Sequence, residues 1–156
     1  MERIINQIHS SLLKNRKSLA VAESCTGGLL SNLLTKISGS SKYFILGIVA
    51  YHDKAKEAIF KIPPSTIAKK GAVSKEVALM MAKNIRKIAK TDFGIGITGI
   101  AGPSGATLQK PLGTVFIALA DRNKIISKKF NFKGKRAAIR KKAALKALKL
   151  LKIFLQ

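Results

Sequence analysis

The segment Glu-Ser-Cys-Thr-Gly-Gly at 23–28 places two small nucleophilic side chains, Ser24 and Cys25, shortly before two glycines. It follows a short apolar run and opens a helical pattern. It therefore predicts a turn at the carboxyl end of a strand, where α/β sheets bind their ligands. The N–H groups of Gly27 and Gly28, with the positive end of the helix dipole, suit an oxyanion or a phosphate. A serine or threonine that only caps the helix explains the segment equally well.

A second segment that could handle protons is Tyr-His-Asp-Lys-Ala-Lys at 51–56, which follows another apolar run. Lys56 beside a serine would form the Ser-Lys pair of nucleophilic catalysis, in which the amine takes the hydroxyl proton. Such a lysine must first lose its own proton, and burial favours that loss. His52 is the next base to consider, because histidine titrates near neutral pH. A solvated surface cluster in which Asp53 caps a helix is the simpler interpretation of this segment taken alone.

A third candidate is the loop at 98–114, whose glycines and prolines lie between two apolar runs. Long loops are frequently functional, and this one could wrap a ligand with backbone groups. The stretch at 94–99 also fits the glycine spacing of a dinucleotide-binding turn. We reject that interpretation because these glycines lie inside the expected strand. Pro103 and further glycines follow where the motif requires a helix.

Composition limits the classes of protein to consider. With 156 residues, of which 47% are hydrophobic, the chain can build one domain with its own core. A single cysteine excludes an internal disulfide and fits a reducing cytoplasm. Two histidines and one cysteine are too few for a zinc site, and no apolar run reaches the length of a membrane helix. We therefore expect a cytoplasmic protein without a metal, a leader or a membrane segment.

The net charge of +23 favours anionic partners such as nucleic acid or phosphorylated metabolites. From Arg122 to Gln156 the chain has thirteen lysines or arginines and no acidic residue. A nucleic-acid surface is one explanation, and lysine used as a general solubilising residue is the other. We favour the second, because no aromatic side chains alternate with the charges as single-strand binding requires.

Short apolar runs alternate with helical patterns, which predicts a three-layer α/β/α domain around a mostly parallel sheet. The expected strands are 18–23, 43–51, 93–98, 113–120 and 124–132. The expected helices are an amino-terminal one with a stripe of Ile4, Ile5, Ile8, Leu12 and Leu13, then 27–37, 53–60, 74–90 and 136–155. Pro63 and Pro64 break the chain, with Ser65 as the expected cap. The last two strands are joined by a short turn, so one of them must run antiparallel.

Taken together, the motifs resemble the carboxy-terminal domain of the CinA family and its stand-alone form, the PncC nicotinamide-nucleotide amidases. The resemblance covers nearly the whole chain in the family's order, with the three segments above at the family's spacing. It is carried by AESCTGGLLSNLL at 22–34, GSS at 39–41, GIVAYHDKAKEAIF at 47–60, KGAVSKEVA at 70–78, GITGIAGPSGATLQKPLGTVFIALA at 96–120 and FKGKRAAIR at 132–140. It implies a single such domain over 1–156, with a mixed five-stranded sheet in three α/β/α layers.

The resemblance implies an amidohydrolase that converts nicotinamide mononucleotide to nicotinate mononucleotide and ammonia, without a cofactor. It implies Ser24 as nucleophile, Lys56 as general base and Tyr51 as the partner of that base. It also implies a small nucleotide substrate and a homodimer. The implied substrate-binding residues are Cys25, Thr26, Gly27, Gly28, Thr98, Gly99, Gly102 and Arg136. The alternative function is a nucleic-acid-associated or regulatory nucleotide-binding module without turnover.

The chain departs from the family's usual pattern in several places. After Tyr51 the family usually reads Ser-Asn-Glu-Ala-Lys, whereas this chain reads His-Asp-Lys-Ala-Lys, with the spacing to Lys56 retained. Ala106 stands in place of a glycine, and Lys135 in place of an aspartate. If the segments form one site, the first three strands must be neighbours. We then expect the Lys56 amine to be buried and within hydrogen-bonding distance of the Ser24 hydroxyl.

Overall fold

The computed structural model describes residues 2–155 and is built on one five-stranded sheet in the order β2-β1-β3-β4-β5. Strand β1 pairs in parallel with both β2 and β3, whereas β4 runs antiparallel to both β3 and β5. Four strands therefore share one direction and β4 opposes them, which confirms the mixed, mostly parallel sheet. The strands are β1 (Leu19–Glu23), β2 (Phe44–Val49), β3 (Phe93–Gly99), β4 (Thr114–Ala120) and β5 (Ile125–Asn131).

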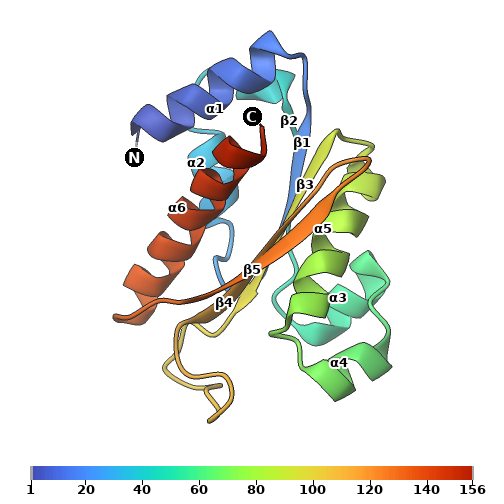
Figure 1. Ribbon diagram of the computed structural model, residues 1–156, viewed down its shortest axis with the longest axis vertical. Coiled ribbons are helices and arrows are strands. Elements are labelled where there is room, and N and C mark those ends of the chain that lie inside the picture. Colours follow the sequence, from blue (N-terminus) through green and yellow to red (C-terminus); the bar gives the residue numbers. More distant parts are fainter. Residues whose placement is uncertain (1, 156) are drawn as a thin grey trace.

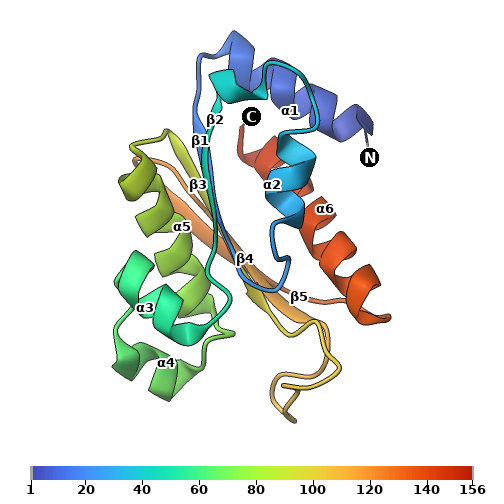
Figure 2. The same cartoon turned by 180° about the vertical axis from the view of Figure 1, so that it is seen from behind.

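Helices cover both faces of the sheet, as Figure 1 and the reverse view in Figure 2 show. Helices α1, α2 and α6 lie on one face, and α3, α4 and α5 lie on the other. This arrangement confirms the three-layer α/β/α architecture. The helices are α1 (Glu2–Lys14), α2 (Leu29–Leu34), the 3₁₀ turn η1 (Ser40–Lys42), α3 (Asp53–Phe60), α4 (Pro64–Lys70), α5 (Lys75–Ala89) and α6 (Arg136–Phe154).

The interior strand β1 is buried along its whole length, and its side chains alternate between two cores. Val21 belongs to the cluster beneath α1, α2 and α6, whereas Ala20 and Ala22 belong to the cluster beneath α3 and α5. Alternate side chains of a strand point to opposite faces of its sheet. The first three expected strands are neighbours, so their carboxyl ends meet at one edge of the sheet.

Two glycines of β3 explain the sequence that imitates a dinucleotide-binding turn. A Cβ added to Gly94 would lie 2.2 Å from the carbonyl oxygen of Ala82, and one added to Gly96 would lie 2.4 Å from that of Ala78. Both carbonyls belong to α5, so the glycines let the α5 backbone pack directly against the sheet. The two glycines therefore serve helix–sheet packing, which agrees with our rejection of a dinucleotide-binding turn at 94–99.

Two helix boundaries differ from expectation. Helix α2 covers Leu29–Leu34 instead of 27–37. It starts later because Gly27 and Gly28 have φ angles of 57° and 91°, which a right-handed helix does not accommodate, and it ends earlier, with Thr35 as its carboxy-terminal cap. The predicted cap at Ser65 is wrong. Pro63 caps α4 and Pro64 occupies its first turn, where a missing N–H costs nothing.

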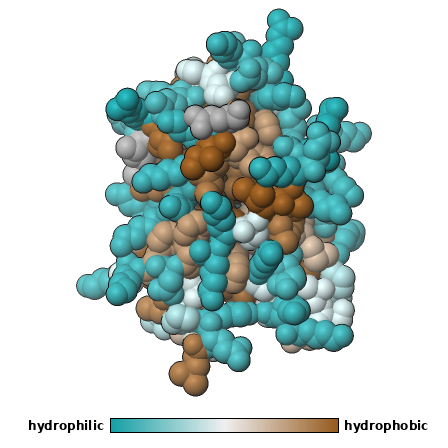
Figure 3. All heavy atoms as spheres, viewed as in Figure 1, coloured by the Kyte–Doolittle hydropathy of each residue, from teal (hydrophilic) through white to brown (hydrophobic). Residues whose placement is uncertain are grey.

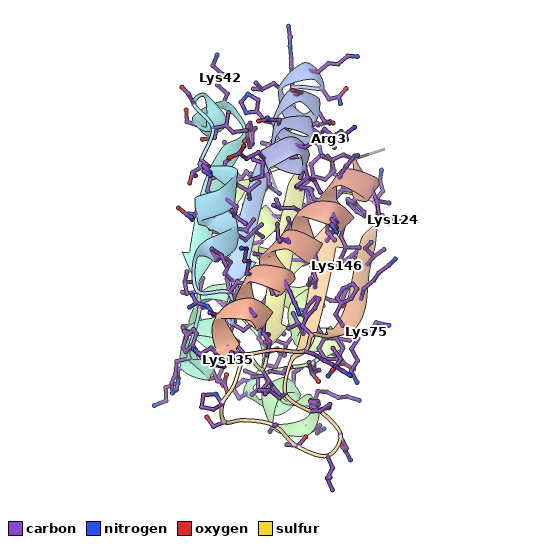
Figure 4. The ribbon with its side chains drawn as sticks, turned by 90° about the vertical axis from the view of Figure 1, so that its left-hand side faces the viewer. Arg3, Lys42, Lys75, Lys124, Lys135 and Lys146 are labelled. Atoms are coloured by element: carbon purple, nitrogen blue, oxygen red, sulfur yellow. The ribbon has the colours of Figure 1, made fainter. Side chains whose placement is uncertain are left out.

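Positive charge is spread over the surface of the molecule. Figure 3 shows one face covered mainly by hydrophilic side chains, with separate apolar areas between them. The basic side chains labelled in Figure 4 come from several different elements and segments, at Arg3, Lys42, Lys75, Lys124, Lys135 and Lys146. Within residues 2–155, none of the helices has the length and apolar character that a bilayer crossing demands.

Candidate active site

A cavity of about 280 Å³ lies beyond the carboxyl ends of β1, β2 and β3. It brings together residues from each of the three sequence segments singled out above, together with the start of α6. The remaining predicted site residues, Thr26, Gly27 and Gly28, do not line it. The predicted residues that line the cavity are Ser24, Cys25, Tyr51, Lys56, Thr98, Gly99, Gly102 and Arg136.

The position of Ser24 is fixed by backbone bonds on both sides. Its N–H donates to the carbonyl of Ile97 on β3 at 3.0 Å, which continues the β1–β3 ladder by one residue. Its own carbonyl accepts the N–H of Gly27 at 3.0 Å, which closes the turn toward α2. The residue is only 6% exposed. Ser24 therefore sits on a rigid turn at the bottom of the cavity.

Glu23 holds this turn from inside the protein. Its carboxylate is fully buried and accepts the N–H groups of Gly28 and Leu30 at 3.1 Å. It also accepts the N–H of Ser31 at 2.7 Å and the Ser31 hydroxyl at 2.6 Å. The anion-binding position predicted at the start of α2 is thus filled by the chain's own carboxylate. The N–H groups of Gly27 and Gly28 are already engaged, and we correct their predicted role accordingly.

Arg140 is a second residue that the sequence interpretation missed. Its guanidinium donates from Nε and Nη2 to the carbonyl of Thr26, at 3.3 and 2.9 Å. The same group lies against Gly27, where an added Cβ would be 2.7 Å from Nη2. Helix α6 therefore fixes the turn that carries Ser24. A basic residue one turn after Arg136, on the same face of the helix, is the signal that points to it.

Cys25 is buried, with 4% of its surface exposed. Burial raises the pKa of the Cys25 thiol to about 12, because the thiolate would lose its hydration. The charge of Glu23 acts in the same direction, whereas Arg140 and Lys56 act against it. Cys25 therefore remains a thiol at neutral pH and lacks the thiolate that nucleophilic attack requires.

Lys56 is buried as predicted, with 2% of its side chain exposed. Its amine donates to the carbonyl of Tyr51 at 3.3 Å and to Oδ1 of Asp53 at 3.2 Å. Within the described chain, no hydrogen bond joins this amine to Ser24. The predicted burial is confirmed. The predicted hydrogen bond to the serine is not formed, because the amine donates to Asp53 and to the Tyr51 carbonyl instead.

The cap of α3 is His52 and not Asp53. The Nδ1 atom of His52 accepts the N–H of Lys54 at 3.2 Å, which places Asp53 in the first turn of the helix. Lys54 is exposed to solvent and does not line the cavity. The histidine is exposed as well, so the residue that faces the cavity from this turn is Asp53.

Arg136 closes the other side of the cavity. Its guanidinium donates from Nη1 to the carbonyl of Gly102 and from Nη2 to the hydroxyl of Tyr51. Tyr51 is 56% exposed, so this contact lies at the rim of the cavity. Arg136 thereby joins α6 to the glycine-rich loop and to the end of β2.

Comparison with known proteins identifies the family of this chain. The family model of the CinA C-terminal domain matches residues 1–155. The chain belongs to the CinA C-terminal domain family. A CinA-like protein of Geobacter sulfurreducens is 47% identical over 135 residues, 86% of this chain and 33% of that protein. A CinA-like protein of Syntrophus aciditrophicus is 47% identical over 148 residues, 94% of this chain and 35% of that protein. The chain thus spans about a third of the length of these CinA relatives.

Crystal structures of CinA-type proteins share the fold. The competence or damage-inducible protein from Enterobacter asburiae superposes with a TM-score of 0.94 at 33% identity, covering 98% of this chain and 96% of that one. The competence/damage inducible protein from Agrobacterium tumefaciens gives a TM-score of 0.95 at 34% identity, covering 99% and 94%. The sheet and helices described above are therefore the CinA fold.

Two further features of this CinA domain concern the walls of the cavity. The hydroxyl of Thr98 donates to the carbonyl of Ala72 at 2.8 Å, which ties the loop before α5 to the end of β3. Lys135, which replaces an aspartate of the family pattern, precedes α6 without a side-chain cap bond. Arg136 is therefore oriented by Gly102 and Tyr51. Among residues 2–155, no three histidine, cysteine or acidic side chains are grouped as a metal ion would require.

Proposed function

We propose that this domain is an amidohydrolase that converts nicotinamide mononucleotide to nicotinate mononucleotide and ammonia. The observation that carries the proposal is the meeting of Ser24, Lys56 and Arg136 around one cavity. Acyl transfer on an anionic carboxamide substrate needs a nucleophile, a base and a group that binds the anion. The Ser24 hydroxyl, the buried Lys56 amine and the Arg136 guanidinium can fill these three roles. The resemblance to the amidases of this family supports the choice of substrate.

In the proposed reaction the Ser24 hydroxyl attacks the carboxamide carbon while a neutral Lys56 amine takes its proton. The resulting oxyanion requires N–H donors beside Ser24. Within residues 2–155 the N–H groups of Cys25 and Thr26 donate to no backbone carbonyl, and we assign them this role. Ammonia leaves with the proton returned by Lys56, and water then hydrolyses the acyl-serine.

The Lys56 amine must break its ion pair with Asp53 before it can accept the proton of the Ser24 hydroxyl. Its bonds to Asp53 and to the Tyr51 carbonyl are 3.2 and 3.3 Å long, and hydrogen bonds of catalytic groups frequently tighten only when substrate is bound. Arg136 lies at the rim, where its guanidinium can pair with the phosphate of the substrate in a bidentate manner. We further propose that the enzyme acts in the cytoplasm as a homodimer.

The test is an assay of the purified protein with nicotinamide mononucleotide, in which ammonia and nicotinate mononucleotide are both quantified. Equal amounts of the two products are expected. Nicotinamide riboside, which lacks the phosphate, should react more slowly through a higher KM, because Arg136 has no anion to bind. Absence of both products under conditions where the protein is folded would contradict the proposal.

A binding module for nucleic acid is the second candidate, and the net charge of +23 is the observation that favours it. A true nucleic-acid surface loses affinity steeply as salt rises, by about 1,000-fold or more between 50 and 200 mM for a protein with several phosphate contacts. Retention of duplex and single-stranded DNA, measured over that range, distinguishes the candidates. Tight, salt-dependent retention without ammonia release would favour the binding module.

A further inference from the structure

Asp53 and Lys56 form an ion pair within the cavity. The Asp53 carboxylate lies 3.2 Å from the Lys56 amine, and the two residues are three positions apart on α3. The Lys56 side chain is 2% exposed and that of Asp53 is 47% exposed, so the pair joins a buried cation to a carboxylate at the cavity surface. Both residues line the cavity that contains Ser24. The reaction proposed above gives Asp53 no role of its own.

This ion pair acts against the form of Lys56 that the reaction needs. A carboxylate at this distance stabilises the ammonium over the neutral amine, and more so where the cation is out of water. The same contact, with that to the Tyr51 carbonyl at 3.3 Å, occupies the amine and leaves no bond to Ser24. Asp53 therefore favours the charged form of the Lys56 amine and also holds the amine away from Ser24.

We propose that Asp53 is a positioning residue that sets the pH at which this site becomes active. At low pH it holds Lys56 as an ammonium ion turned away from Ser24. As the pH rises, the Lys56 amine releases its proton to water and the ion pair is lost. The neutral amine is then free to accept the Ser24 hydroxyl. The proposal rests on the proposed function in taking Lys56 as the base.

The other groups around the amine do not substitute for Asp53. The remaining titratable or charged side chains that line the cavity are Cys25, Tyr51 and Arg136. Cys25 is a buried neutral thiol, and the Tyr51 hydroxyl accepts a hydrogen bond from Arg136. Helix α5 packs against α3 but contributes no residue to the lining. Among the described residues that line the cavity, Asp53 is the carboxylate that can stabilise the protonated form of Lys56.

The test is a pH titration of Lys56 in protein without added substrate. The titration is monitored by NMR of lysine labelled with ¹³C at the ε carbon. The Lys56 signal is assigned by its loss in Lys56→Met. In Asp53→Asn, which keeps the shape and removes the charge, the titration midpoint should fall by about 1 pH unit. Asp53→Glu, which keeps the charge, should restore most of the wild-type midpoint. Equal midpoints in wild-type protein and Asp53→Asn would overturn the proposal.

Glu57→Gln is the matched control, because it makes the same change of charge on the same helix. Glu57 forms no ion pair within the described chain. Its variant should keep the wild-type midpoint. An equal fall in both variants would assign the effect to net charge and overturn the role of Asp53.

The amidase assay gives a second, separable readout. The acid limb of kcat/KM against pH should move to lower pH in Asp53→Asn by the same amount as the NMR midpoint, and should stay unchanged in Glu57→Gln. An acid limb that stays in place while the NMR midpoint moves would overturn control of activity by Asp53. Wild-type protein that releases no ammonia would contradict the proposed function instead, and the NMR titration would still decide whether Asp53 holds the Lys56 proton.

Discussion

Arg136, the first residue of α6, donates a hydrogen bond to the hydroxyl of Tyr51, just beyond the end of β2. The two residues are 85 positions apart in the sequence. Since the same guanidinium also reaches Gly102, one cation connects the closing helix, the glycine-rich loop and the rim of the cavity. The candidate site is therefore assembled only when α6 packs against the sheet.

Replacing Arg136 should weaken substrate binding more than it slows chemistry. In Arg136→Ala we expect KM for nicotinamide mononucleotide to rise by about 10- to 100-fold, because a charge-assisted bidentate contact with the phosphate is lost. Steady-state kinetics measure the change. Lys149→Gln, an exposed position on the same helix, is the control and should leave KM unchanged. Equal effects of the two substitutions would mean that Arg136 only adds to the general surface charge.

Cys25→Ala should retain most of the amidase activity. With a pKa of about 12, the thiol is ionised at pH 7 in only about one molecule in 100,000. Alkylation of Cys25 should accordingly be slow in the folded protein and fast in urea, as mass spectrometry of the labelled protein can follow. Complete loss of activity in Cys25→Ala, with the fold intact, would transfer the role of nucleophile from Ser24 to Cys25.

Glu23→Gln should destabilise the domain and disturb the turn that carries Ser24. The substitution removes the charge and turns an amide donor toward N–H groups that need acceptors. We expect the free energy of unfolding to fall by about 3 kcal/mol, measured by urea denaturation. Glu76→Gln, which breaks only the surface pair with Lys70, is the control and should cost less than about 1 kcal/mol. Similar losses would contradict the role given to Glu23.

Asp92 should make stability depend on pH in the acid range. Burial by itself raises the pKa of Asp92, but hydrogen bonds from the Ser18 N–H, from Lys17 and from the Ser18 hydroxyl outweigh it and lower the pKa below its usual value. A carboxyl whose pKa is lower in the folded state stabilises the protein above its unfolded pKa of about 3.9 and loses that contribution as pH falls through the folded value.

Asp92→Asn should therefore lower the free energy of unfolding at pH 7 by about 1 kcal/mol. The difference from wild-type protein should shrink as the pH falls below about 4. Urea denaturation at pH 7, 5 and 3 measures both quantities. A difference that stays constant over this range would show that the ionised carboxylate does not stabilise the link between β1 and β3.

Much of the fold follows from local pattern. The run at 19–23 is apolar, short and followed by glycines, and such a run forms a buried interior strand whichever helices cover it. A serine at the start of a helical pattern is a typical cap, and the Ser74 hydroxyl accepts the N–H of Val77 at the start of α5. Because neighbouring parallel strands end at one edge of the sheet, the meeting of Ser24, Tyr51 and Thr98 could be predicted without any contact being known.

The contacts that hold the site together could not be predicted in this way. Glu23 accepts donors from α2 only because Gly27 and Gly28 turn that helix back over it. Helical spacing places Arg140 on the same face as Arg136, but it does not reveal that Arg140 contacts Thr26, which lies 114 positions away in the sequence. The orientation of Lys56 toward Asp53 depends on competition between nearby acceptors, which sequence spacing does not decide.

The most direct measurement is the rate of ammonia release from nicotinamide mononucleotide by wild-type protein and by Ser24→Ala. Ser24 forms backbone hydrogen bonds but contributes no side-chain hydrogen bond within residues 2–155, so the variant should fold normally, as circular dichroism can verify. We predict that the wild-type protein releases ammonia and that Ser24→Ala is slower by at least about 1,000-fold, since loss of an acyl-transfer nucleophile is that severe. A folded Ser24→Ala variant that keeps more than a small fraction of the wild-type rate would contradict the account.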